Sequence, residues 1–141
     1  MPPITPPTPS SDIPPVSSAG NKVLCIEDEH FISELYVRAL TKAGYDVTVE
    51  VDGQAGLKQA QTDQYDIILL DLMIPTITGI EVLRHLRNPE ETPHLHSKII
   101  ITTNLEQRED IRADIERQAD GYLVKADITP RELVALLSTI K

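Results

Sequence analysis

The chain of 141 residues contains one cysteine, Cys25, which excludes an internal disulfide and any zinc site that needs several thiolates. It has no hydrophobic run near the roughly 20 residues that a membrane-spanning helix requires. The N-terminus also lacks a basic start followed by an apolar stretch, so no secretory signal is expected. These absences predict a soluble, cytoplasmic protein with no membrane segment.

Basic residues are scarce as well. The chain has 13 Lys and Arg against 22 Asp and Glu, which gives a formal net charge of -9. Nucleic-acid binding needs clustered Lys and Arg, so we expect no direct DNA binding. Neither of the glycine-rich patterns G-x-x-x-x-G-K-[ST] and G-x-G-x-x-G occurs, which disfavours nucleotide hydrolysis and flavin or NAD binding.

Proline is concentrated at one end of the chain. Seven of the 11 prolines lie within the first fifteen residues, and residues 1–20 are mainly Pro, Ser and Thr. Such a composition predicts a disordered leader, partly in polyproline II conformation, and the folded domain is therefore expected over residues 21–141. The P-x-x-P spacing of Pro3, Pro6 and Pro9 leaves a role as an adaptor ligand open beside the simpler interpretation of a solvated leader.

The rest of the sequence alternates between two kinds of segment. Short apolar or alternating segments predict strands, and apolar residues at helical spacing predict helices. The expected strands are 22–26, 47–51, 66–70, 99–101 and 122–124, and the expected helices are 31–40, 55–60, 80–86, 105–118 and 130–140. Short connections between alternating strands and helices predict an α/β fold, (βα)5 and doubly wound, with a five-stranded parallel sheet covered on both faces.

Two threonines are expected to begin helices. Thr129 is followed by Pro130 and Glu132, which is the pattern of a capping box with proline in the first turn. Thr78 can cap the third expected helix, because a threonine hydroxyl can accept a hydrogen bond from a backbone amide of the first turn. These signals fix the expected starts of two helices more sharply than apolar spacing alone.

Chemically active side chains follow the expected strands. Glu27 and Asp28 follow the first strand, Asp71 the third, Thr102 the fourth and Lys125 the fifth. In a parallel sheet these ends meet at one edge, near a topological switch point. Crowded carboxylates without His or Cys suit Mg²⁺, while a lysine and a hydroxyl can bind phosphoryl oxygens. The set predicts transfer of a phosphoryl group onto Asp71.

The ordered combination of these segments is similar to the response regulator receiver domain, the CheY-like family. The matching segments are 23–29, 67–75, 99–103 and 121–125, together with Gly79. The resemblance covers about residues 22–141 and implies a flavodoxin-like fold. It also implies a role in phosphorelay signalling of a two-component system, as a single-domain phosphoprotein.

The resemblance implies a role for each site residue. Asp71 is implied as the phosphoacceptor and a metal ligand, Asp28 as a direct Mg²⁺ ligand and Glu27 as an acid that holds the metal through water. The backbone carbonyl of Met73 is implied as another metal ligand. Lys125 is implied as the cation that pairs with the phosphoryl group.

Thr102 is implied as the hydroxyl that follows the phosphoryl group, and Tyr122 as the aromatic switch whose ring turns inward when Thr102 moves. The implied donor is a phosphohistidine on a histidine kinase or phosphotransfer protein. The implied output is a changed surface on the fourth helix, fifth strand and fifth helix. The resemblance also implies a domain that assists only its own phosphorylation and dephosphorylation, so we do not expect an enzyme.

The chain departs from the family pattern after Lys125, where Ala126 replaces the usual proline, and we expect a different path for this loop. Since the chain ends at Lys141, we expect an unknown protein as the downstream target, bound by a monomer or a phosphorylation-dependent dimer. Two alternatives remain open. A phosphatase resembling haloacid dehalogenases would need an Asp at the position of Met73, and a phosphorylation-independent binding module is favoured only by Ala126.

Other candidate residues have simpler interpretations. Cys25 lies in an expected strand and is interpreted as a buried apolar residue rather than a nucleophile. His94 and His96 have no further ligand at helical spacing and are interpreted as part of a surface loop. The spaced charges of the expected helix 105–118 are interpreted as a solvated face, with a partner-facing surface as the alternative.

Overall fold

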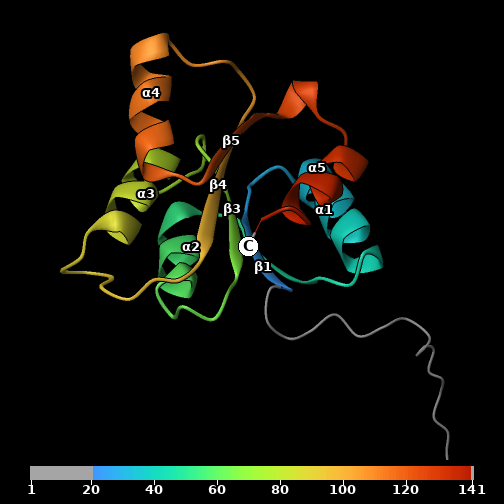
Figure 1. Cartoon of the computed structure of the whole chain (residues 1–141), viewed down its shortest axis with the longest axis horizontal. Helices are drawn as coiled ribbons and strands as arrows, with labels where there is room; N and C mark the ends of the chain where they lie inside the picture. Colours follow the sequence, from blue (N-terminus) through green and yellow to red (C-terminus); the bar gives the residue numbers. More distant parts are fainter. Residues whose placement is uncertain (1–20, 141) are drawn as a thin grey trace, which may run out of the picture.

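The computed structural model describes residues 21–140, which form a five-stranded sheet with helices on both faces (Figure 1). The predicted leader, residues 1–20, lies outside the described residues. None of the described helices is long and apolar enough to cross a bilayer. The strands are β1 (Lys22–Ile26), β2 (Asp46–Glu50), β3 (Ile67–Asp71), β4 (Lys98–Thr103) and β5 (Gly121–Val124). The helices are α1 (His30–Lys42), α2 (Gly53–Ala60), α3 (Gly79–Arg87), α4 (Glu109–Gln118) and α5 (Pro130–Leu137).

The sheet is parallel throughout, in the order β2-β1-β3-β4-β5. From β1 the chain moves outward to the edge strand β2, and then crosses back to add β3 on the other side of β1. The direction of winding therefore reverses between β1 and β3, which makes their carboxyl ends the topological switch point. The predicted doubly wound (βα)5 fold is confirmed.

Two hydrophobic clusters lie on opposite faces of the sheet. Helices α2, α3 and α4 cover one face, and α1 and α5 cover the other (Figure 1). Along β1 the side chains alternate, so that Leu24 and Ile26 join the first cluster whereas Val23 and Cys25 join the second. Burial raises the pKa of the Cys25 thiol to about 12, and this side chain is therefore an inert part of the core, as predicted.

The predicted helix starts at the two threonines are confirmed. The Thr78 hydroxyl accepts a hydrogen bond from Glu81 N at 3.2 Å, and the Glu81 carboxylate accepts one from Thr78 N at 3.0 Å. Thr129 and Glu132 exchange the same pair of hydrogen bonds at 3.1 and 2.8 Å. Both capping boxes satisfy amide groups that the first turn of a helix leaves without partners.

The predicted helix over residues 105–118 is wrong at its start, because α4 begins at Glu109. The preceding residues bond to groups outside a helix. The Thr103 hydroxyl donates to Leu105 O at 3.0 Å, and Gln107 N donates to the Tyr122 hydroxyl at 3.2 Å. Local hydroxyl bonds of this kind compete with helix formation. Helix α5 stops at Leu137 instead of reaching residue 140, and the hydroxyls of Ser138 and Thr139 donate to Ala135 O and Leu136 O near this end.

Candidate functional site

Three carboxylates meet at the carboxyl edge of the sheet. Glu27 and Asp28 follow β1 and Asp71 ends β3, and one oxygen from each lies within 4.8 Å of the others. Glu27 and Asp71 are each only 2 % exposed, whereas Asp28 is open to solvent. The cluster, defined here as the acidic cluster, therefore has two buried members and one side that a cation from solvent can reach.

Lys125 supplies a positive charge to the acidic cluster. It follows β5 as the first residue of a short 3-10 turn, Lys125–Asp127, and its side chain is 4 % exposed. Its Nζ donates to Glu27 Oε1 at 2.6 Å and to Asp71 Oδ2 at 3.1 Å. Burial alone would lower the pKa of Lys125, but the hydrogen bond to Glu27 and the charge of Asp71 raise it overall. The lysine is thus held in its charged form.

The departure at Ala126 does not prevent this contact. Ala126 lies inside the 3-10 turn, and residues 21–140 contain no cis peptide bond. Lys125 reaches both buried carboxylates from this turn. Whether the path of this turn differs from that of relatives with proline at this position stays a prediction.

The negative charge of the Glu27 carboxylate is only partly compensated by its surroundings. Its pKa is raised overall from the ordinary value of 4.5 to about 7: burial raises it, the hydrogen bond from Lys125 lowers it, and the neighbouring charge of Asp71 raises it. One ammonium group therefore does not fully compensate two buried carboxylates. A divalent cation at this edge would favour the ionised form of Glu27.

The oxygen donors fit a hard cation such as Mg²⁺. Glu27, Asp28 and Asp71 offer carboxylate oxygens, and no nitrogen or sulfur ligand belongs to the cluster. Met73 N donates to Asp71 Oδ1 at 3.2 Å, which places Met73 beside the cluster. The role of its backbone carbonyl stays a prediction. The Met73 side chain is 70 % exposed and contributes no acid or base to the site.

The two threonines that end β4 point to opposite faces of the sheet. In the parallel register Thr102 pairs with Asp71 and Ile101 pairs with Tyr122. Ile101 and Tyr122 pack in the same hydrophobic cluster. Because side chains alternate along a strand, Thr103 shares the face of Tyr122, and Thr102 points to the opposite face. The resemblance implied Thr102 as the switch hydroxyl. Which of the two successive threonines faces Tyr122, however, depends on the register of β4.

Tyr122 is half-buried and is held at its hydroxyl by the loop before α4. Its oxygen accepts the hydrogen bond from Gln107 N, and the Gln107 side chain donates to the Thr103 hydroxyl at 3.4 Å. The guanidinium carbon of Arg112 lies 4.6 Å from the centre of the Tyr122 ring. Thr103, the loop and Tyr122 are therefore connected by direct contacts.

The predicted surface loop at His94 and His96 lies at the other end of the sheet. His96 Nδ1 is 2.7 Å from Asp63 Oδ1, and its Nε2 is 3.3 Å from Asp66 Oδ1, just before β3. Partial burial lowers the pKa of His96, but its hydrogen bonds to Asp66 and Asp63 raise it overall. Within residues 21–140 these groups do not form a metal-binding set; the acidic cluster does.

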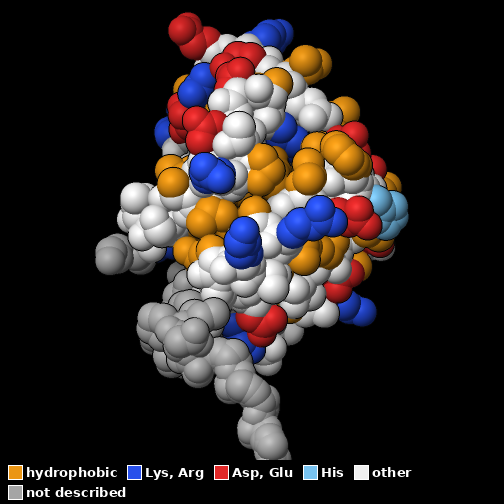
Figure 2. Space-filling model, turned by 90° about the vertical axis from the view of Figure 1, so that its right-hand side faces the viewer, with side chains coloured by type: hydrophobic (Ala, Val, Ile, Leu, Met, Phe, Trp, Pro, Cys, Tyr) orange, Lys and Arg blue, Asp and Glu red, His pale blue; other side chains and the backbone are white. Residues whose placement is uncertain are grey.

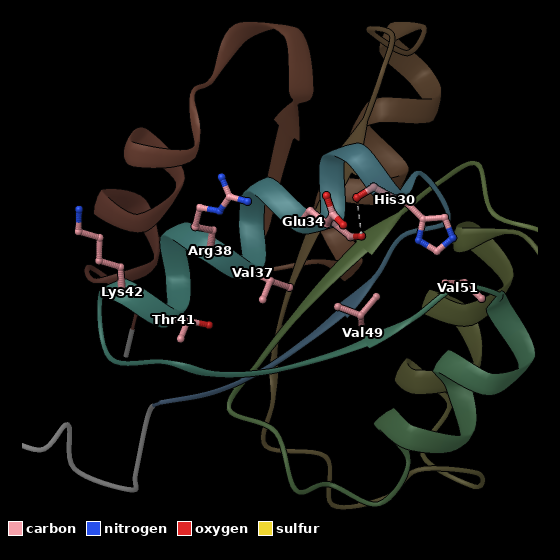
Figure 3. Close-up of a pocket in the computed structure, with 9 residues that line it drawn as sticks. His30, Glu34, Val37, Arg38, Thr41, Lys42, Val49 and Val51 are labelled. Carbon is pink, nitrogen blue, oxygen red and sulfur yellow. Dashed lines mark hydrogen bonds between the residues drawn. The ribbon is translucent and has the colours of Figure 1, made fainter. Parts of the chain in front are cut away.

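A shallow groove between α1 and β2 is separate from the acidic cluster (Figure 3). Val37 and Val49 lie within it, and Arg38 and Lys42 stand along the helix beside it. Figure 2 shows this side of the molecule, where Lys and Arg side chains lie among hydrophobic ones. None of the acidic cluster residues lines the groove, so the chemistry is assigned to the sheet edge.

Comparison with known proteins identifies relatives of this chain. A family model described as the response regulator receiver domain matches residues 23–138. The response regulator ArlR of Staphylococcus saprophyticus is 38% identical over 120 residues, and ArlR of Staphylococcus aureus strain Mu50 is equally similar. These alignments cover 85% of this chain but only 50% and 51% of the two relatives. The chain thus spans about half the length of the curated relatives that it matches.

Solved structures with the same fold include the chemotaxis response regulator CheY4 of Vibrio cholerae, with a TM-score of 0.73 and 28% identity over 86% of this chain and 98% of that chain. The BeF3-activated receiver domain of Klebsiella pneumoniae RstA has a TM-score of 0.72 and 28% identity, covering 84% of this chain and 96% of that chain. Since the family model covers nearly all described residues, the chain belongs to the family of response regulator receiver domains.

Proposed function

We propose that this receiver domain accepts a phosphoryl group on Asp71 from a phosphohistidine of a histidine kinase or phosphotransfer protein, with Mg²⁺ as cofactor. The observation that carries the proposal is the meeting of three carboxylates with a buried lysine at the switch point of the sheet. Phosphoryl transfer relies on positioning and charge neutralisation, and this edge provides both.

Asp71 is positioned as the nucleophile by two contacts. Its Oδ1 accepts the hydrogen bond from Met73 N, and its Oδ2 lies 3.1 Å from Lys125 Nζ. A carboxylate oxygen would attack phosphorus while the bond from phosphorus to the donor imidazole nitrogen breaks, and that nitrogen keeps the electron pair. Lys125 lies where it can pair with the phosphoryl oxygens of the product.

Glu27, Asp28 and Asp71 would hold Mg²⁺, with the carbonyl of Met73 as a further ligand. When bound, the ion supplies positive charge to the oxygens of the phosphoryl group. A phosphatase of the haloacid dehalogenase type is not supported, because Met73 cannot serve as the acid and base two residues after the nucleophile. Regulation through the surface of α4, β5 and α5 is part of the same proposal.

Incubation with phosphoramidate and Mg²⁺, followed by intact mass, tests the function. The expected result is the gain of one phosphoryl group that requires Mg²⁺ and is absent in Asp71→Asn. Asp46→Asn is the matched control, because Asp46 is an exposed carboxylate at the start of the edge strand β2. No gain in folded wild-type protein would favour a phosphorylation-independent binding module, and a gain in Asp71→Asn would place the acceptor elsewhere.

We further propose that Thr103, rather than Thr102, is the switch hydroxyl. In the proposed switch, one hydroxyl moves away from Tyr122 and toward the phosphoryl group. Thr103 fits this role because it lies on the same face of the sheet as Tyr122 and accepts a hydrogen bond from the Gln107 side chain. The bond to a charged phosphoryl group is worth about 1.5–3 kcal/mol, so Thr103→Val should slow phosphorylation about tenfold or more. Thr102→Val should retain the rate within about threefold; the reverse ranking would return the role to Thr102.

A further inference from the structure

Arg112 contacts the ring of Tyr122, and Gln107 contacts its hydroxyl. The guanidinium group of Arg112, in α4, lies over the ring at 4.6 Å from its centre. The backbone amide of Gln107, in the loop before α4, donates to the Tyr122 hydroxyl at 3.2 Å. A cation over an aromatic face is attracted by the ring quadrupole, so this arrangement favours the present position of the ring.

Two carboxylates orient the guanidinium group. Arg112 Nη1 lies 2.9 Å from Glu106 Oε1, and Arg112 Nε lies 3.5 Å from Glu116 Oε2, one turn further along α4. Because Glu106 precedes Gln107 in the loop, the loop contacts both Arg112 and the Tyr122 hydroxyl. The loop, the helix and the ring are thus joined through one arginine.

We propose that Arg112 is a positioning residue that holds Tyr122 in its present, half-exposed position and so opposes activation of the domain. The proposal rests on the proposed function, in which the ring turns inward after phosphorylation. Inward rotation separates the ring from Arg112 and from Gln107 N. Thr103 contacts the same loop through Leu105 and Gln107, so movement of Thr103 also loosens the segment that carries Glu106.

Titration with beryllofluoride in Mg²⁺ tests this proposal, because beryllofluoride mimics a phosphoryl group on an aspartate. Ring signals of 13C-labelled tyrosine, assigned with Tyr122→Leu, report the position of Tyr122. Arg112→Ala should lower the half-saturating concentration about two- to fivefold, which is the size of an exposed cation–π contact. Arg117→Ala is the matched control: Arg117 is also on α4 and is paired with Asp114 at 2.9 Å, but it does not contact the ring.

A double variant separates positioning from a general effect on the helix. In the Tyr122→Leu background the ring and its signals are gone, so the half-saturating concentration is read there from the backbone amide signals of 15N-labelled protein. The further change Arg112→Ala should leave this concentration unchanged. An unchanged or higher concentration in Arg112→Ala alone would overturn the inference, as would an equal gain in the Tyr122→Leu background or in Arg117→Ala. Absence of any response in the wild-type protein would overturn the proposed function and this inference with it.

Discussion

Lys125→Met is expected to destabilise the fold by about 3 kcal/mol at pH 8 in metal-free buffer. Lys125 pairs with Glu27 and Asp71, and all three side chains are nearly inaccessible to solvent. Removing one partner of a buried ion pair leaves the other charge uncompensated, which typically costs about 3–5 kcal/mol. Urea unfolding followed by far-UV circular dichroism measures the loss.

The loss should depend on pH. The pKa of Glu27 is already raised from 4.5 to about 7, and the hydrogen bond from Lys125 opposes that rise. Without Lys125 the pKa of Glu27 rises further, so the folded state of Lys125→Met holds a proton that the unfolded state releases above about pH 5. Below about pH 7 the folded wild type keeps this proton as well, so the stability of the variant relative to wild type falls as the pH rises above about 7.

Two comparisons support or contradict this expectation. Lys58 is an exposed lysine on α2, and Lys58→Met should change stability by less than about 0.5 kcal/mol. Mg²⁺ should restore part of the stability of Lys125→Met, because it supplies positive charge to the same carboxylates. Equal stability of Lys125→Met and wild type at pH 8 would show that the acidic cluster does not need this lysine.

The arrangement of strands and helices was predictable because each buried strand is a short apolar run that alternates along the chain with segments of helical spacing. The start of α4 was not, because residues 105–108 have a sequence that is compatible with a helix. Their structure depends on hydrogen bonds to Thr103 and to Tyr122, and Tyr122 lies fifteen residues after its partner Gln107. A local sequence pattern does not reveal a hydrogen bond between residues so far apart in the chain, and the start of the helix was therefore predicted too early.

The candidate site was also predictable only in part. The meeting of Glu27, Asp28, Asp71 and Lys125 follows from parallel strands that end at one edge, so the sequence was sufficient to predict it. The choice between two successive threonines depends on which residue of β4 faces Tyr122, and a shift of one residue reverses the face. The register of a strand is decided by tertiary pairing, which a single sequence does not reveal.

Gly79→Ala is expected to destabilise the protein and to impair phosphorylation together. Gly79 begins α3, and its amide donates to Leu72 O at 3.0 Å. A Cβ at this position would lie 2.3 Å from Asp71 O and 2.7 Å from Leu72 Cα. Both are backbone atoms, so either α3 or the end of β3 must shift. Such overpacking costs about 1–3 kcal/mol.

The functional loss follows from where the backbone would move. The displaced atoms belong to the phosphoacceptor and the residue after it, and misplacement by about 1 Å can slow a positioned reaction about 100-fold. Gly121→Ala is the control, because the three atoms nearest to its Cβ all belong to the Ile100 side chain, and the one approached within 3 Å is the flexible end, Cδ1, at 2.8 Å. We expect nearly unchanged stability and phosphorylation there. Normal stability with normal phosphorylation of Gly79→Ala would mean that α3 can move without carrying Asp71, and positioning of the nucleophile would then have to come from Lys125 and Met73 alone.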